Sequence, residues 1–210
     1  MDVKDGLNTK SAYVSASIGA TLFPEDASST DILMKNADQA MYATKNSGRN
    51  CWSFFTSHMR AATETHSKTT SDLRNALSDH QLYLLYQPII ELATGNVHKA
   101  EALIRWQHPE KGMLYPAEFI AIAEETNLIS DIGDWVFKQA VNQVAQWQAN
   151  FDTKFQISVN KSPKQFFSKK SDWMTHLSEL GLSWHSIIVE ITENLLLDRA
   201  YSKSITNCFN

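Results

Sequence analysis

The chain has 210 residues, of which 43% are hydrophobic and 20% charged, with a formal net charge of -4. This is the composition of a globular protein, and it excludes a disordered or membrane-embedded chain. The slightly acidic balance gives no basic surface for DNA or RNA, so any phosphate recognition must be local.

No apolar run approaches the roughly 20 residues of a membrane span, and the N-terminus has no signal-peptide pattern. The two cysteines, Cys51 and Cys208, form no metal or redox spacing, which is typical of a protein of the reducing cytoplasm. We therefore expect a soluble, cytoplasmic polypeptide, although a longer parent could carry an anchor.

The first part of the chain predicts a strand, a helix and a second strand. Residues 14–22 have the alternating pattern of a strand, which places Val14, Ala16 and Ile18 on one face. Thr30 is expected to cap a helix that Gly48 ends, and residues 51–55 read as a short aromatic strand. Such a β-α-β unit cannot bury both of its faces alone, so it indicates part of a larger domain.

A polar stretch, residues 56–71, follows and is expected to link two units, with the option of extending as a helix. Ser71 is expected to cap a short helix after it. Residues 81–90 and 97–106 then predict a β-hairpin with a turn at 93–96.

The second strand of this hairpin carries charges inside an apolar run. Because side chains alternate along a strand, Glu101, Leu103 and Arg105 share one face. An acid and a base on that face are costly unless each has a partner or a ligand. One interpretation is a structural ion pair between neighbours, and the other is a metal ligand followed by an anion-binding arginine.

Strands and helices alternate in the rest of the chain, which predicts βα units around a parallel sheet. The expected elements are a loop over 107–113, helices from 116, over 130–149, over 173–180 and over 195–205, and strands over 155–160 and 187–193. Polar residues end these strands, where a β/α barrel places its site: Glu101 and Arg105, then Asn160, then Glu190 and Glu193.

Three of these residues, Glu101, Asn160 and Glu190, would bring oxygen donors from three strands. Carboxylate and amide oxygens suit Mg²⁺ or Mn²⁺, and two such ions can hold a phosphodiester and activate water for in-line attack. Arg105 could bind a phosphate oxygen with its fork of donors. Each residue alone has a structural alternative, since Asn160 could cap the next helix and Glu190 could pair with a lysine.

The first unit resembles a known family. Ala-Asp-Gln-Ala-Met-Tyr-Ala-Thr-Lys-Asn-Ser-Gly-Arg-Asn at 37–50 is similar to the C-terminal end of a GGDEF (diguanylate cyclase) domain, and residues 14–19 resemble the strand before it. The family's Gly-Gly-Asp-Glu-Phe hairpin does not occur in this sequence, so we expect no cyclase activity. Lys45 and Arg49 match residues that contact nucleotide phosphates in that family. They are expected to be vestigial nucleotide-binding positions or ordinary charges at a helix end.

The second unit resembles the EAL domain, a family of cyclic di-GMP phosphodiesterases, through Ala-Glu-Ala-Leu-Ile-Arg-Trp at 100–106. Residues 116–125, 159–162 and 190–193 are similar to the family's next motifs in the same order. The resemblance implies an α/β fold, with a partial (β/α)8 barrel of the TIM type preceded by a β-α-β remnant of a GGDEF domain.

The same resemblance implies roles for individual residues. Glu101, Asn160 and Glu190 would bind Mg²⁺ or Mn²⁺, and Glu193 would hold the loop that organises a second metal. Gln87 and Arg105 would contact cyclic di-GMP, which the family hydrolyses to pGpG. The resemblance also allows a homodimer that forms through this domain.

The family's later motifs, an Asp-Asp-Phe-Gly sequence followed by a lysine and a glutamate, are not among these 210 residues. A barrel of this type needs about 250 residues. We therefore expect residues 1–57 to be the GGDEF remnant, 58–71 a linker and 72–210 a truncated EAL domain that is inactive alone. The alternatives are a non-catalytic cyclic di-GMP-binding or interaction module, and a non-functional gene fragment whose tail, 206–210, results from a frameshift or a premature stop.

Overall fold

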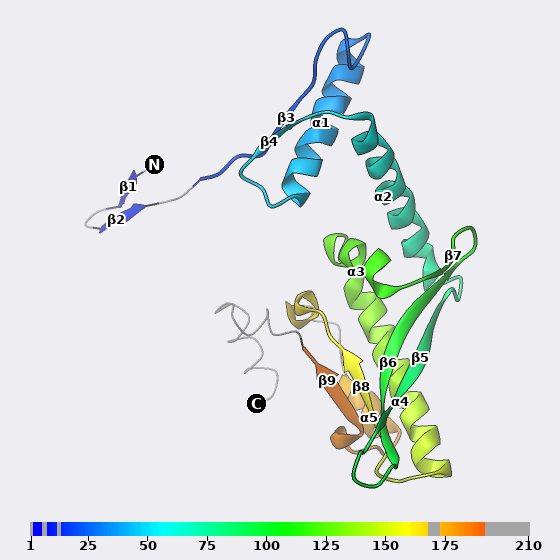
Figure 1. The fold of residues 1–210 in the computed structure, drawn as a ribbon. Helices are drawn as coiled ribbons and strands as arrows, with labels where there is room; N and C mark the ends of the chain where they lie inside the picture. The colour runs from blue at the N-terminus through cyan, green and yellow to red at the C-terminus, as the bar shows by residue number, and fades with distance from the viewer. Residues whose placement is uncertain (1, 6–7, 12–13, 168–172, 192–210) are drawn as a thin grey trace. The chain divides into compact units, whose positions relative to one another are not determined.

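The computed structural model describes residues 2–5, 8–11, 14–167 and 173–191 (Figure 1). The chain divides into two compact units, Met1–Lys68 and Thr69–Asn210. Helix α2 (Ser57–Ala76) contributes to both. The expectation of a separate short helix capped by Ser71 is wrong, because residues 57–76 form one continuous helix of 20 residues with Ser71 in its interior.

The first unit has the predicted β-α-β order. Strand β3 (Ile18–Ala20) pairs in parallel with β4 (Trp52–Phe54), and helix α1 (Thr30–Asn46) connects them. The strand expected over residues 14–22 is shorter than predicted, because its partner offers only three residues for pairing. An antiparallel pair before it, β1 (Asp2–Asp5) with β2 (Asn8–Ser11), was not predicted by the sequence.

Helix α1 lies directly against β3 at Gly19. A β-carbon at this position would lie 2.1 Å from the carbonyl oxygen of Ala37 and 2.2 Å from the amide nitrogen of Met41. Only glycine therefore allows this approach of helix to strand. Ile18 is 56% exposed, so the apolar side chain predicted for the strand does not face the helix.

Both caps of α1 lie one residue earlier in the chain than the sequence predicts. The N-cap is Ser29 and not Thr30, since the Ser29 hydroxyl accepts a hydrogen bond from the amide of Ile32. The C-cap is Ser47, and Gly48 follows it with a φ of +112°, a conformation that favours glycine.

The second unit is built on a sheet in which β5 is antiparallel to β6, whereas β6, β8 and β9 are parallel (Figure 1). Its strands are β5 (Leu82–Ile90), β6 (Val97–His108), β7 (Gly112–Leu114), β8 (Gln156–Asn160) and β9 (Ile187–Glu190). The loop predicted over 107–113 is wrong, because β6 continues to His108 and pairs with β7 through Gln107 and Met113.

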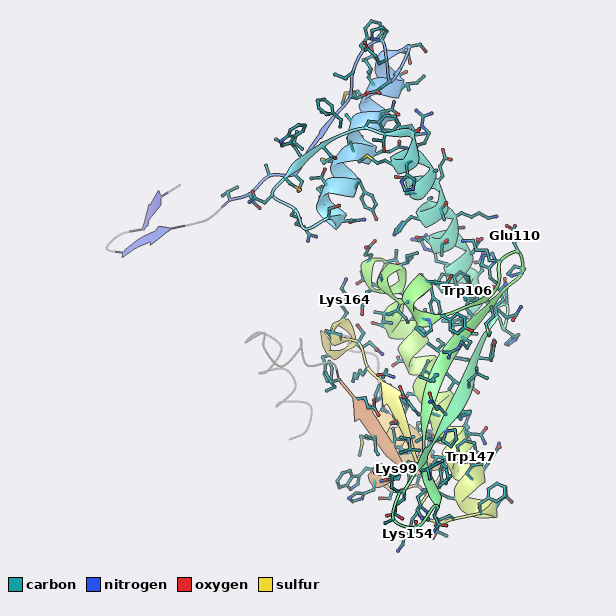
Figure 2. The ribbon with its side chains drawn as sticks, viewed as in Figure 1. Lys99, Trp106, Glu110, Trp147, Lys154 and Lys164 are labelled. Atoms are coloured by element: carbon teal, nitrogen blue, oxygen red, sulfur yellow. The ribbon has the colours of Figure 1, made fainter. Side chains whose placement is uncertain are left out.

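Helices cover one face of this sheet. They are α3 (Pro116–Glu125), α4 (Ile129–Asn150) and α5 (Trp173–Glu179), with short 3-10 turns η1 (Pro163–Phe167) and η2 (Trp184–Ser186). Trp106 is fully buried in the core between them, 5.7 Å from the ring of Phe119 (Figure 2). The alternation of parallel strands with covering helices is the partial α/β barrel that the sequence predicts.

The predicted helix over 195–205 and the last residues of the strand predicted over 187–193 lie outside the described residues. No helix in the described part of the chain is long and apolar enough to cross a membrane.

Candidate functional site

The face of the sheet opposite the helices carries the polar residues. Ala100, Ala102 and Trp106 are buried under the helices, so Glu101, Leu103 and Arg105 project from the other face, as the alternation of the sequence predicts. The registers of β6, β8 and β9 then place further residues on the same face: Ser158, Asn160, Ile188 and Glu190.

Glu101 and Asn160 meet on this face. The Nδ2 atom of Asn160 donates a hydrogen bond to Oε1 of Glu101 over 2.8 Å. The contact follows from the parallel pairing of β6 with β8, in which Ala102 stands opposite Val159, so that Asn160 comes one residue after the last paired position. A carboxylate and a carboxamide are thus held together where the parallel pairing of β6 with β8 ends.

Glu190 continues this row on the next strand. It is the register partner of Asn160, and its carbonyl oxygen accepts a hydrogen bond from the amide of Lys161 over 2.9 Å. Both Asn160 and Glu190 are exposed. The structure therefore brings the three predicted oxygen donors onto one face of three adjacent parallel strands. Asn160 and Glu190 are the last residues of β8 and β9, where α/β folds place ligands, whereas Glu101 lies inside β6, which continues to His108.

Gln87 and Arg105 flank the row on the β5 and β6 side. Gln87 is exposed and stands opposite Glu101 in the antiparallel register. Arg105 donates from Nη1 to the carbonyl oxygen of Ile104 over 2.8 Å, and its guanidinium carbon lies 4.9 Å from the centre of the Tyr115 ring. Among the described residues no ion pair joins Arg105 to Glu101, so the structural ion-pair interpretation of this strand is not what the fold forms.

Two buried polar atoms on this face have no partner within the described chain. They are the Nε of Arg105 and the hydroxyl of Ser158, and Ser158 stands opposite Glu101 in the β6–β8 register. Ser158 was not predicted as a site residue, although its position two residues before Asn160 places it on the same strand face.

A cavity of about 490 Å³ opens beside the row, between α3, α4 and the loop that follows β8. Asn160, Glu190 and Glu124 line it together with apolar side chains. Ser162 donates from its hydroxyl to Oε1 of Glu124 over 2.8 Å, and Lys164, labelled in Figure 2, donates from Nζ to the Glu124 carbonyl over 2.7 Å. Glu124 was not predicted as a site residue.

The turn after β8 also settles one alternative role of Asn160. The Ser162 hydroxyl accepts a hydrogen bond from the amide of Lys164 over 3.3 Å at the start of η1. Ser162 thus caps this turn, whereas the Asn160 amide contacts Glu101.

The donor set fits a hard divalent cation by its chemistry. Two carboxylates and one amide offer oxygens only, and oxygen ligands are what Mg²⁺ and Mn²⁺ prefer. The single hydrogen bond between Asn160 and Glu101 uses the amide nitrogen and one carboxylate oxygen, leaving the amide oxygen as a donor. No group of three His, Cys, Asp or Glu side chains lies together in the described part of the chain, so the set depends on the amide of Asn160.

The remaining predicted residues lie elsewhere. Glu193 is outside the described residues. Lys45 and Arg49 are exposed at the C-terminal end of α1 in the first unit, where the helix dipole favours cations.

Comparison with protein families gives two matches in chain order. The family model of the EAL domain matches residues 70–207, and the model described as diguanylate cyclase, GGDEF domain, matches residues 4–51.

Similar proteins are longer than this chain. MucR of Pseudomonas aeruginosa, a bifunctional diguanylate cyclase/cyclic di-GMP phosphodiesterase, is 42% identical over 187 residues, which cover 86% of this chain and 27% of MucR. The cyclic di-GMP phosphodiesterase PdeR of Escherichia coli is 37% identical over 188 residues, which cover 89% of this chain and 28% of PdeR. The chain thus spans about a quarter of the length of these relatives.

Solved structures give the same fold. The MucR phosphodiesterase in complex with c-di-GMP matches with a TM-score of 0.62 and 34% identity, covering 66% of this chain and 57% of that one. The EAL domain of FimX from Pseudomonas aeruginosa bound to c-di-GMP matches with a TM-score of 0.57 and 26% identity, covering 67% of this chain and 56% of that one.

Proposed function

The chain belongs to the EAL domain family through residues 70–207, and we propose on that premise that it acts in cyclic di-GMP signalling, with a phosphodiesterase-type site on the open face of its sheet. The observation that carries the proposal is the contact of Asn160 with Glu101 over 2.8 Å, with Glu190 as the register partner of Asn160 and Arg105 on the same face of β6. Oxygen donors and a guanidinium on one sheet face are the groups that a metal-assisted phosphodiester site requires.

Each residue has a proposed role. Glu101, Asn160 and Glu190 would hold Mg²⁺ or Mn²⁺, which when bound polarises a phosphodiester and lowers the pKa of a coordinated water. Arg105 would donate to a phosphate oxygen, and Gln87, opposite Glu101, would contact the dinucleotide. Glu193 would hold the loop that organises a second metal.

Three further parts of the proposal concern organisation. We propose residues 1–57 as the C-terminal part of a GGDEF domain, 58–71 as a linker and 72–210 as the N-terminal part of the EAL domain, supported by family matches to 4–51 and 70–207. A cytoplasmic location is proposed because the sequence has only two cysteines, far apart and without metal or redox spacing. A homodimer through the EAL domain is the assembly to test by light scattering.

A polypeptide of these 210 residues alone is proposed to bind cyclic di-GMP without hydrolysing it. The site residues Gln87, Arg105 and Glu101 are present, whereas the Asp-Asp-Phe-Gly motif that the family resemblance requires for the second metal is not in this sequence. A longer protein that combines this sequence with that motif is proposed to hydrolyse cyclic di-GMP to pGpG.

The test is calorimetric titration of the 210-residue chain with cyclic di-GMP in the presence of Mg²⁺, alongside an assay for pGpG. Binding without pGpG is the expected result. Release of pGpG would show that the residues present suffice for catalysis. Absence of binding by a chain that unfolds cooperatively would overturn the proposal, and a chain without cooperative unfolding would favour the non-functional fragment.

A further inference from the structure

We propose that Tyr115 is a positioning residue for Arg105, and that its ring fixes the guanidinium in the orientation that receives an anionic group of the ligand. The identity of the ligand, a phosphate of cyclic di-GMP, rests on the proposed function. The contact between ring and guanidinium rests on the geometry of this chain alone.

The ring of Tyr115 is held at the edge of the site by its backbone. Tyr115 stands between the end of β7 and the start of α3. Its amide donates to Oε2 of Glu118 over 2.8 Å, and its carbonyl accepts from the amide of Glu118 over 2.9 Å. Pro116 follows, which restricts Tyr115 to the extended conformation observed, with a ψ of 159°. The backbone that carries the aromatic side chain is therefore fixed in position.

The guanidinium of Arg105 lies over this ring, with its central carbon 4.9 Å from the ring centre. Such a distance is typical of a cation–π contact. The side chain of Tyr115 remains half exposed, and its hydroxyl makes no hydrogen bond within the described chain. The contact therefore depends on the ring and not on the hydroxyl.

In this orientation the guanidinium of Arg105 has N–H donors available for a ligand. Nη1 donates to the carbonyl oxygen of Ile104 over 2.8 Å, while Nε is buried and has no partner among the described residues. A donor hidden from water without an acceptor is unfavourable, so an anion that reaches it is bound more strongly. The other tyrosine near Arg105 is Tyr83, its cross-strand neighbour, and the Tyr83 hydroxyl is engaged with Sδ of Met113 at 2.9 Å.

Holding the guanidinium in place before the ligand arrives reduces the side-chain entropy lost on binding. Tyr115→Phe should therefore bind cyclic di-GMP as the unchanged chain does. Tyr115→Leu should bind about two- to fivefold more weakly, which is the effect expected of one cation–π contact at an exposed position. Tyr115→Met, which is unbranched, serves as a second variant that lacks the ring.

The control is Trp184→Leu, which removes another exposed aromatic side chain at the opposite end of the sheet, just before β9. It should leave cyclic di-GMP affinity unchanged. An equal loss of affinity in Trp184→Leu and Tyr115→Leu would mean that the effect is general and would overturn the proposal, as would a loss in Tyr115→Phe.

A second readout does not need the ligand. The Nε–H proton resonance of Arg105, assigned by its disappearance in Arg105→Lys, should be shifted by the ring current of Tyr115 in the 210-residue chain and in Tyr115→Phe. The shift should vanish in Tyr115→Leu and Tyr115→Met. If the unchanged chain fails to bind cyclic di-GMP, the proposed function fails. The Nε–H resonance then still shows whether the Tyr115 ring holds the Arg105 guanidinium. A resonance that stays in place in both ringless variants would overturn the proposal.

Discussion

Asn160 donates a hydrogen bond from Nδ2 to Oε1 of Glu101 over 2.8 Å, although the two residues are 59 positions apart in the sequence. The bond joins Glu101, inside β6 and next to the last position of its parallel pairing with β8, to Asn160, the last residue of β8. A neutral amide beside a carboxylate is stable without a cation, whereas two carboxylates at this distance would need one.

This pair gives the first prediction. Asn160→Asp should lower the melting temperature of the metal-free chain by about 2–4 °C, the shift expected for about 1 kcal/mol in a chain of this size, because like charges then meet. Adding Mn²⁺ should raise the melting temperature of Asn160→Asp more than that of the unchanged chain, since a second carboxylate strengthens a divalent site. Differential scanning calorimetry with and without Mn²⁺ measures both effects.

The matched control is Asn50→Asp, an exposed change of the same kind in the first unit. It should show no response to Mn²⁺ beyond that of the unchanged chain. If Asn160→Asp responds no more than Asn50→Asp, residues 101 and 160 do not form a cation site.

The sequence predicts which side chains share a face but not which of them touch. Alternation along β6 places Glu101 with Arg105 because the period of a strand is two residues. The contact of Glu101 with Asn160 depends on the β6–β8 register, which is set by packing of the intervening helices and leaves no local pattern. The contact of the Arg105 guanidinium with the Tyr115 ring cannot be predicted from the sequence either, because it also depends on how separate elements pack.

Element ends were missed where a tertiary contact decides them. Strand β3 is short because β4 pairs with three residues only, and β7 is too short for its three residues to show a period. Helix α2 passes through Ser71 because a serine at a helix interior costs little when the turns on both sides continue. Long amphipathic elements such as α4, predicted over 130–149 and observed over Ile129–Asn150, are set by their own periodicity.

The second prediction concerns His108, which is almost fully buried. Its Nδ1 accepts from the amides of Glu110 and Lys111 over 3.1 and 3.2 Å, so its proton is on Nε2, which faces Oδ2 of Asp72 at 3.1 Å. Asp72→Ala leaves this buried donor without an acceptor. The expected cost is about 1–3 kcal/mol of unfolding free energy, measured by urea denaturation.

Asp72→Asn retains an oxygen acceptor and should restore most of the lost stability. Glu64→Ala, an exposed change on the same helix, should stay within about 0.5 kcal/mol of the unchanged chain. Equal stabilities of Asp72→Ala and Asp72→Asn would argue against the hydrogen bond to His108.

The third prediction is a pH dependence at Asp152. The backbone amide of Lys154, which donates to Oδ1 over 2.9 Å, and secondly the side chain of His98, 2.8 Å from Oδ2, hold the pKa of Asp152 below its ordinary value of 3.8. A carboxyl group with a lowered pKa stabilises the fold above the pKa of the unfolded chain, about 3.9, and this stabilisation is lost as the pH falls through the folded value. Carbon-detected NMR titration of the carboxyl group measures the shift.

The order of the two causes can be tested. His98→Ala should leave the pKa of Asp152 still below 3.8, because the hydrogen bond from the amide of Lys154, the largest single cause, remains. A return of the Asp152 pKa to 3.8 in His98→Ala would instead make the imidazole the main cause.

The last prediction links α4 to the loop that follows Asn160. A β-carbon on Gly133 would lie 1.7 Å from Nε2 of Gln165, a buried side chain whose Oε1 accepts from the amide of Ser162 over 2.8 Å. Gly133→Ala should gain about 1 kcal/mol of helix propensity but lose up to about 3 kcal/mol by overpacking against Gln165, which is buried and hydrogen-bonded. The expected net destabilisation in urea unfolding is therefore up to about 2 kcal/mol. In a Gln165→Ala background the obstacle is gone, so the same substitution should stabilise the chain. This reversal of sign in a double-mutant cycle isolates the contact, and a destabilisation of equal size in both backgrounds would show that Gly133 is required for another reason.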